Sequence, residues 1–388
     1  MLILILSIFA AGAAAAQGSK DRSLSLPELD RRVRADSNDP ALQLQLGRKL
    51  QEAGRHDDAE RRFRHVVAVA PGLAAGYLAL GSVPKSRGES YWKKREKKEG
   101  LEPELAAWNE ASKFVRLAFL LDPLVDPALI PRVQERVTLR IDGVNYRVWW
   151  MLPLGKAINA FRAGKYADAK RKLDNLLKDP SAGTDGSGLP GDVLWFRALA
   201  SAHLNDYQTA ATDFTVLMTH VMREAEQGMQ GTPLLANDHR YMAAVMLYYS
   251  GQNDVARVLL QEALGADPSL YMAHSQLARI HEDAGRLDEA AAERQRAVDA
   301  NPDNGSLLAD LGLTLLRAGM NEEAFDAFVQ AGTMNSRDSR AAYQAGVTAL
   351  ALGRREQARK WLQRFAAIAP ARMGAQRADA QRHLESIK

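Results

Sequence analysis

The sequence predicts an all-α protein made of repeated pairs of helices, and the stretch Tyr271–Asn304 shows the pattern most clearly. Its 34 residues read as two helices back to back. The first is expected to end at Gly285, because glycine tolerates the positive φ of a tight interhelical turn. The second is expected to end at Pro302, because a proline cannot continue a helix. Hydrophobic residues make up 46% and charged residues 25% of the chain, so it can bury a continuous core.

The same residue types recur at the same spacing through most of the chain. In the stretch above they are Leu277, Ala278, Gly285, Ala290, Ala297 and Pro302. This spacing resembles that of the tetratricopeptide repeat, a helix-turn-helix unit of about 34 residues. The resemblance covers nearly all of residues 40–370, in about eight units. It implies an α-solenoid, a right-handed superhelix in which each unit stacks on its neighbours.

We expect one elongated repeat domain over residues 40–370, because solenoids grow by adding units. A lone helix at 24–39 is expected to cap its N-terminal end. A helix rich in Arg, Gln and Ala at 371–388 is expected to cap its C-terminal end. Two insertions, at 84–103 and 124–149, interrupt the repeats.

The first residues of the chain predict export. Met1–Ala16 is an apolar run that ends in small residues, as in the hydrophobic region and cleavage site of a signal peptide. We expect cleavage after Ala16, a mature protein that starts at Gln17 in the periplasm, and no membrane span after cleavage. The run lacks the usual basic residue at its start, so an uncleaved anchor is the rival interpretation.

The first insertion places Tyr91 and Trp92 directly before a basic run at 93–98. One interpretation is a solvated helical extension. The other is an anion-binding surface that contacts an acidic protein or an anionic lipid.

The second insertion predicts a small β-hairpin. Asp142 and Gly143 stand between two short runs of alternating polar and apolar residues, the pattern of a hairpin with a two-residue type I′ turn. We expect this hairpin to pack on the solenoid. The rival interpretation is a continuous helix broken at Gly143.

The sequence lacks the residues that several kinds of site need. The chain has no cysteine, which excludes disulfides, cysteine zinc sites and thiol catalysis. It also lacks the motifs of zinc proteases, serine hydrolases, nucleotide-binding loops and calcium loops. The formal net charge of +4 is small for 388 residues and does not indicate nucleic acid as a partner. We therefore expect no catalytic residues and no cofactor.

His274 and His281 lie two turns apart on one predicted helix face, which would suit a metal site. In the repeat family, however, their positions pack between helices. We expect structural histidines and no bound metal.

The resemblance also indicates where a partner would bind. In the family, certain positions of each first helix face a concave groove that holds peptide segments. In this chain the predicted peptide-binding residues are Met151, Leu154, Phe161, Trp195, Tyr241, Tyr248 and Tyr249. Aromatic side chains suit peptide binding because they offer large contact areas with few torsions to fix. The alternative is that the hairpin and the insertions fold back and cover this strip.

Two functional hypotheses remain at this stage. The first is an exported scaffold that binds a peptide segment of an envelope or secreted partner in the concave groove. The second is an accessory subunit, or an enzyme without a recognisable motif, that acts on an envelope polymer at a site formed by the insertions. A pocket that gathers Glu89, Glu96, Glu135 and Asp142 would favour the second hypothesis.

Overall fold

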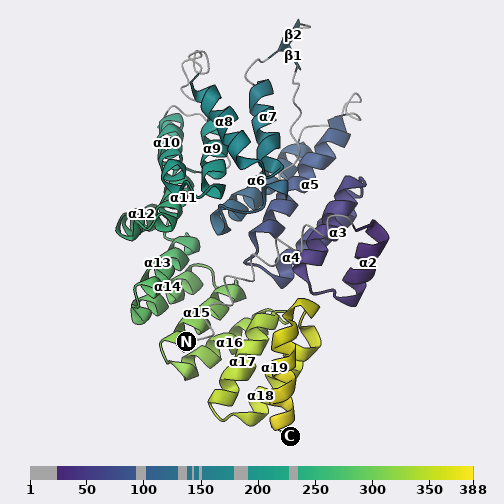
Figure 1. Ribbon diagram of the computed structural model, residues 1–388, viewed down its shortest axis with the longest axis vertical. Coiled ribbons are helices and arrows are strands. Elements are labelled where there is room, and N and C mark those ends of the chain that lie inside the picture. Colours follow the sequence, from purple (N-terminus) through teal and green to yellow (C-terminus); the bar gives the residue numbers. More distant parts are fainter. Residues whose placement is uncertain are drawn as a thin grey trace. The chain divides into compact units, whose positions relative to one another are not determined.

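The computed structural model describes residues 24–92, 102–129, 138–141, 144–147, 151–178, 191–226 and 235–387. Most of these residues lie in α-helices that follow each other as helix-turn-helix pairs (Figure 1). The predicted all-α repeat fold is therefore confirmed.

The helices fall into two groups, because the contacts divide the chain into two compact units. Unit 1 combines Met1–Leu101 with Pro302–Lys388, and unit 2 consists of Glu102–Asn301. The helices of unit 1 are α2 (Leu26–Ala35), α3 (Pro40–Glu52), α4 (His56–Val69), α5 (Ala74–Trp92), α15 (Gly305–Arg317), α16 (Asn321–Met334), α17 (Ser339–Ala351), α18 (Arg355–Ile368), the 3-10 helix η2 (Ala371–Met373) and α19 (Gly374–Ser386). The elements of unit 2 are α6 (Glu102–Leu121), the 3-10 helix η1 (Pro127–Leu129), β1 (Thr138–Ile141), β2 (Val144–Arg147), α7 (Met151–Arg162), α8 (Tyr166–Leu177), α9 (Gly191–His203), α10 (Tyr207–Glu226), α11 (Ala236–Tyr249), α12 (Asn253–Ala266), α13 (Tyr271–Asp283) and α14 (Leu287–Ala300).

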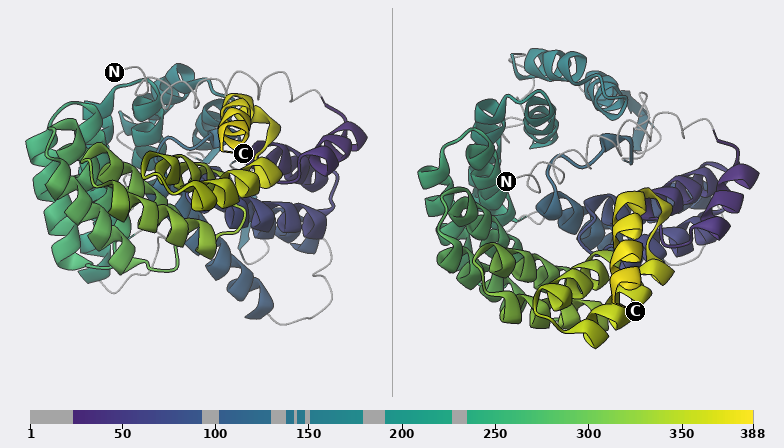
Figure 2. Two further views of the ribbon diagram at one scale, coloured as in Figure 1. Left: turned by 90° about the horizontal axis from the view of Figure 1, so that it is seen from below. Right: turned by 60° about the horizontal axis from the view of Figure 1, so that its bottom comes forward.

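Consecutive helices pack against each other in both units, as a solenoid requires (Figure 2). In unit 2 this holds from α7 through α14, and in unit 1 from α2 through α5 and from α15 through α19. The turn inside each repeat is tight. Gly285 has φ 73°, as the sequence predicted, and its N–H donates to the carbonyl of Glu282 at 3.0 Å.

Small residues on first helices let large residues of second helices approach closely. A Cβ atom added to Gly312 on α15 would lie 2.6 Å from Cε1 of Phe328 on α16. Phe328 is fully buried. This contact explains why a glycine precedes the interhelical turn by seven residues in this repeat.

Unit 1 brings the first and last repeats of the chain together, which a simple linear solenoid would not do. The backbone N–H of Ala371 donates to Oδ2 of Asp36 at 2.7 Å. The amide of Asn335 donates to the carbonyl of Ala68 at 3.1 Å, and the yellow C-terminal helices lie beside the purple N-terminal ones in Figure 2. These contacts tie residues near both ends of the chain into unit 1.

The predicted β-hairpin is confirmed. Strand β1 pairs with β2 in antiparallel register, with Ile141 opposite Val144. That register leaves the two residues Asp142 and Gly143 between the strands, as the sequence indicated.

Helices also lie inside both stretches that the sequence assigned to caps, α2 within 24–39 and α19 within 371–388. The predicted signal peptide, Met1–Ala16, lies outside the described residues. Among the helices that the structure describes, none has the length and apolar character of a membrane span.

Candidate interaction surface

The predicted peptide-binding residues all lie on first helices of unit 2, namely α7, α9 and α11. The structure divides them by burial. Leu154, Phe161 and Tyr241 are 6%, 1% and 4% exposed, so these three are part of the core. Trp195, Tyr248 and Tyr249 are half-buried. Met151 begins α7, and its side chain is not among those described.

Helix α6 accounts for part of this burial, because it lies against α9 and α11. The guanidinium of Arg116 donates to both carboxylate oxygens of Asp238, at 2.7 and 2.8 Å. Phe119 meets Trp195 edge to face, with ring centroids 5.1 Å apart. Helix α6 therefore covers part of the first helices of later repeats.

Asp238 has a second role beside its ion pair. It accepts a hydrogen bond from the backbone N–H of Leu235 at 2.8 Å and so caps the N-terminus of α11. Its side chain is only 1% exposed. Burying a carboxylate is costly unless it is paired with a positive charge. Arg116 supplies that charge to the buried carboxylate of Asp238.

A histidine lies next to this ion pair. His239 is buried between Trp195 and Phe214, with ring centroids 5.7 and 6.4 Å away. Burial lowers the pKa of His239 from its ordinary 6.5 to about 4, although the neighbouring Asp238 opposes the shift. His239 is therefore neutral at pH 7.

Half-buried aromatic residues remain where α11 ends and α10 begins. The rings of Tyr248 and Tyr249 are tilted against each other with centroids 5.5 Å apart, and the centroid of the Tyr207 ring lies 5.3 Å from that of Tyr249. The guanidinium carbon of Arg279 on α13 lies 5.1 Å from the centre of the Tyr248 ring and 5.9 Å from that of Tyr249. We call Tyr207, Tyr248, Tyr249 and Arg279 the tyrosine–arginine cluster.

Two acidic residues interact with this cluster. The hydroxyl of Tyr248 donates to Oδ2 of Asp283 at 2.5 Å. Burial, and then this hydrogen bond, raise the pKa of Tyr248. Asp122, just after α6, has its pKa raised by burial and lowered in part by Leu124 and by the charge of Arg279. Arg279 therefore lies over aromatic rings and interacts with the charge of an acidic side chain.

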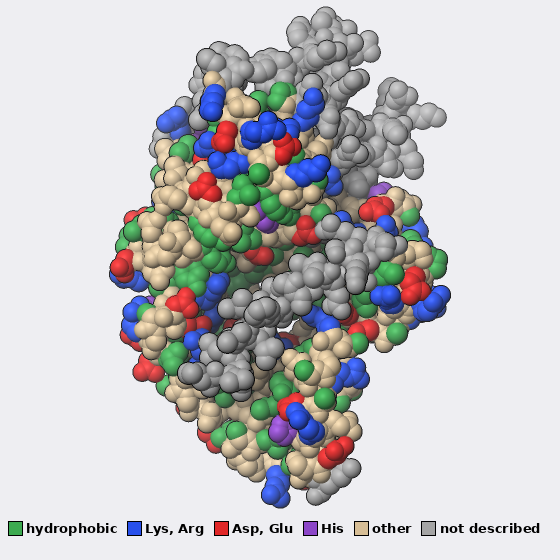
Figure 3. Space-filling view, in the orientation of Figure 1, with side chains coloured by type: hydrophobic (Ala, Val, Ile, Leu, Met, Phe, Trp, Pro, Cys, Tyr) green, Lys and Arg blue, Asp and Glu red, His purple; other side chains and the backbone are tan. Residues whose placement is uncertain are grey.

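Figure 3 shows hydrophobic side chains gathered on the visible face of unit 2, with lysine and arginine side chains above them. Surfaces of this kind, with tyrosine and arginine near an apolar patch, are typical of protein interfaces.

The two histidines on α13 have structural partners. Nδ1 of His274 lies 2.7 Å from Oε2 of Glu293 on the paired helix α14. His281 accepts a hydrogen bond from Nε of Arg286 at 3.1 Å. Among the residues that the structure describes, no group of His, Asp and Glu side chains could hold a metal ion.

Other predicted features cannot be placed. The basic run 93–98 and Glu96 and Glu135 lie outside the described residues, as do the side chains of Glu89 and Asp142. The residues predicted from the sequence did not include Tyr207, which lies beside Tyr249. The pairing of Arg116 with Asp238 was not predicted either, because two residues 122 positions apart give no local signal.

Comparison with known proteins adds to this geometry. The family model described as a tetratricopeptide repeat matches residues 154–217 and 241–305. No curated protein matches the chain.

Several solved structures resemble the chain at low identity. MamA, residues 41 to the end, from Desulfovibrio magneticus RS-1 is 20% identical, with 48% of this chain and 94% of that one covered and a TM-score of 0.37. YrrB, described as a TPR protein with an unusual peptide-binding site, is 17% identical, with 49% and 88% covered and a TM-score of 0.34. The C-terminal part of a TPR repeat-containing protein from Cytophaga hutchinsonii is 15% identical, with 58% and 83% covered and a TM-score of 0.44.

The structure of the matched stretches agrees with the family model. The matched stretches contain helix pairs with the same tight turn, in which Gly164, Gly251 and Gly285 have φ between 73° and 80°. Residues 154–217 and 241–305 of the chain are therefore tetratricopeptide repeats.

Proposed function

We propose that the protein is an exported scaffold that holds a peptide segment of an envelope or secreted partner at the tyrosine–arginine cluster. Tetratricopeptide repeats generally act as non-enzymatic scaffolds that bind proteins or peptides.

One observation carries the choice of surface. On the first helices that the family uses for binding, Leu154, Phe161 and Tyr241 are buried, whereas Tyr248 and Tyr249 remain half-buried around Arg279. Tyrosine and arginine are the residue types most often found at interface hot spots. The cluster therefore contains residues of the predicted groove that a partner can still reach.

The rings and charges of the cluster favour a peptide with both apolar and polar groups. Tyr207, Tyr248 and Tyr249 offer ring faces for an apolar or proline-containing segment. Arg279 offers guanidinium N–H groups to the carbonyls or carboxylates of that segment. Asp283 holds the Tyr248 hydroxyl at 2.5 Å and so fixes the orientation of this ring before binding, which lowers the entropy cost of association.

A capture experiment tests the surface. The full chain and its Tyr248→Ser/Tyr249→Ser variant would be used to capture partners from envelope extract, and a synthetic peptide from a captured protein would then be titrated against both. We expect the variant to bind the peptide at least about tenfold more weakly, because each lost aromatic anchor contributes roughly 2 kcal/mol.

A matched control distinguishes an effect of the cluster on affinity from the effect of any substitution on the surface. Val258 on α12 is 47% exposed and lies on a second helix, so Val258→Ser should leave the affinity unchanged. Equal affinities of the wild type and the tyrosine variant would overturn the proposal.

Export needs a separate test, because it rests on Met1–Ala16 alone. The protein would be isolated from the fraction outside the cytoplasm of fractionated cells. N-terminal sequencing should find Gln17 as its first residue. Intact Met1 on cytosolic protein would contradict export while leaving the binding surface open to its own test.

A further inference from the structure

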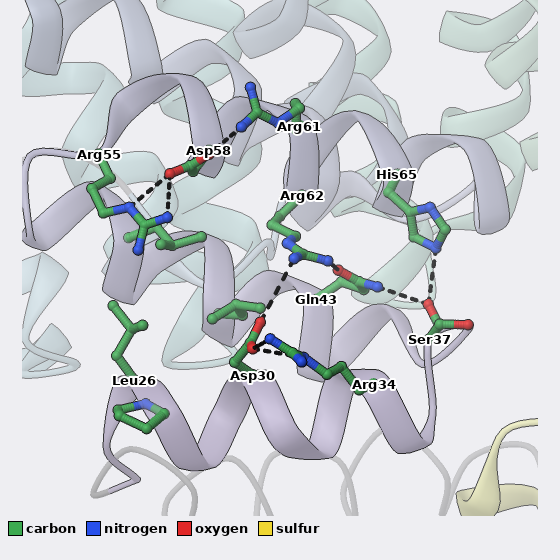
Figure 4. A pocket seen from close by; sticks show the side chains of 13 residues that line it. Leu26, Asp30, Arg34, Ser37, Gln43, Arg55, Asp58, Arg61, Arg62 and His65 are labelled. Carbon is green, nitrogen blue, oxygen red and sulfur yellow. Dashed lines mark hydrogen bonds and ion pairs between the residues drawn. The ribbon is translucent and has the colours of Figure 1, made fainter.

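Unit 1 contains a pocket whose residues no prediction from the sequence used. Its volume is about 620 Å³, and it lies between α2 and α4 with α3 as its floor (Figure 4). Gln43, Leu46 and Leu50 line the floor, and both leucines are buried. The side chains of its rim are mainly arginines and aspartates.

One part of the rim comes from α4 and the residue before it. Asp58 lies between two arginines (Figure 4). Nε of Arg55 donates to Oδ2 of Asp58 at 2.6 Å, and Arg61 donates to Oδ1 of the same carboxylate. One negative charge therefore holds two guanidinium groups at this end of the pocket.

A second group has the same composition but joins two helices. Nε of Arg34 donates to Oδ2 of Asp30 on α2 at 2.9 Å, and Nη2 of Arg62 on α4 lies 3.8 Å from Oδ1 of Asp30. Arg62 also donates to Oε1 of Gln43 at 3.5 Å, a long hydrogen bond. Figure 4 shows Asp30 between Arg34 and Arg62.

The charges that line the pocket do not balance. Four arginines stand against two aspartates, which leaves an excess of two positive charges. His65 does not add to them at neutral pH, because burial lowers its pKa and Arg337 and Arg62 lower it further, although Ser37 opposes the shift. Each arginine has five N–H donors, more than one shared carboxylate can accept, so donors remain for another anion.

We propose that this pocket binds an acidic peptide segment through the two groups Arg55–Asp58–Arg61 and Arg34–Asp30–Arg62. The chemistry that recognises the ligand is bidentate pairing of arginine with carboxylate. A peptide fits better than a single small anion, because the two groups lie at different places along the pocket and only a segment with two or more carboxylates engages both. These residues lie on α2 and α4, with Arg55 directly before α4, and they are separate from the first-helix positions of the proposed function.

The test uses fluorescein-labelled hexaglutamate and fluorescence anisotropy with the full chain. We expect Arg61→Gln/Arg62→Gln to weaken binding by about tenfold or more, since it removes one arginine from each group. The matched control is Arg31→Gln on α2. Arg31 pairs with Glu28 three residues away and its side chain is 77% exposed, yet it does not line the pocket, so we expect less than about a twofold change.

A variant with the opposite sign guards against a general loss of structure. Asp58→Asn frees Arg55 and Arg61 from their shared carboxylate, so the probe should bind more tightly. A purely structural role of Asp58 predicts weaker binding, and a thermal melt of each variant shows whether the fold is retained.

Two further results would overturn the proposal. Equal weakening by Arg31→Gln and Arg61→Gln/Arg62→Gln would assign binding to net charge alone. Displacement of hexaglutamate by inorganic phosphate, beyond the effect of sodium chloride at equal ionic strength, would assign the pocket to single small anions instead of peptides.

Discussion

Arg116 and Asp238 lie 122 residues apart in the chain, and the guanidinium of the first donates to both carboxylate oxygens of the second. This bidentate pair joins α6 to α11 inside unit 2. It fixes α6 against the first helices that the sequence predicted as a binding groove. The remaining accessible part of that surface is therefore defined by where α6 ends.

The first prediction concerns this pair. Arg116→Met should lower the free energy of unfolding by about 3 kcal/mol, because it leaves the carboxylate of Asp238 buried without its partner. Urea denaturation measures the change. Arg171→Met is the matched control. Arg171 pairs with Asp168 at the surface, and its side chain is 69% exposed, so its loss should change the free energy of unfolding much less. Equal costs of the two substitutions would show that α6 does not depend on the pair.

His239 predicts a pH dependence of stability. Its pKa of about 4 in the folded protein lies below the ordinary 6.5 expected after unfolding, so between these values the unfolded chain binds more protons. The free energy of unfolding should therefore fall as the pH is lowered from 6.5 to 4, by up to about 3 kcal/mol from this group. His239→Phe, which keeps a ring between Trp195 and Phe214, should have a smaller decrease over that range. An identical pH profile would contradict the assignment.

The close contact at Gly312 gives a test of repeat packing. Gly312→Ala would place a Cβ 2.6 Å from the Phe328 ring and should cost roughly 1 to 3 kcal/mol through overpacking. Gly374→Ala is its control, because no neighbouring atom lies within 4 Å of the added Cβ and alanine favours a helix. The difference between the two variants in urea denaturation measures the packing term. If Gly312→Ala were as stable as Gly374→Ala, helices α15 and α16 would not be in the contact described.

The loop contacts inside unit 1 predict coupling between the two ends of the chain. Asp36→Ala removes the acceptor of the Ala371 N–H, so hydrogen exchange of that amide should become faster. Exchange in α11 of unit 2 serves as the internal reference and should not change. Unaltered exchange at Ala371 would mean that the first and last repeats behave independently in solution.

The repeats could be predicted from the sequence because their signals are local. Gly285 forms the turn within one helix pair, and Gly312 makes room for the phenylalanine of the paired helix. The two strands of the hairpin are separated in the sequence only by Asp142 and Gly143. Because the same residue types recur at a constant spacing, the same prediction applies to each repeat along the chain.

The interaction surface could be predicted only in part, because its burial depends on contacts that the repeat spacing does not encode. The sequence predicts the same peptide-binding role for Tyr241 and Tyr248. In the structure, however, Tyr241 is 4% exposed and Tyr248 is half-buried. Asp122, which follows α6 and is far from Tyr241 in the sequence, interacts with Tyr241 in the fold. The pocket at Asp30 and Asp58 was missed for the same reason, since it forms only when α2 and α4 lie over α3.

Site-specific crosslinking tests the proposed peptide-binding surface most directly. A photoreactive phenylalanine derivative would replace Tyr249 in one sample and Val258 in another, each in the full chain and in the presence of envelope extract. We predict one dominant crosslinked partner from position 249, none from position 258, and loss of that product when Arg279→Gln is added to the first sample, because Arg279 lies over the ring of Tyr249. Equal products from both positions, or a product from position 249 that persists with Arg279→Gln, would contradict binding at the tyrosine–arginine cluster.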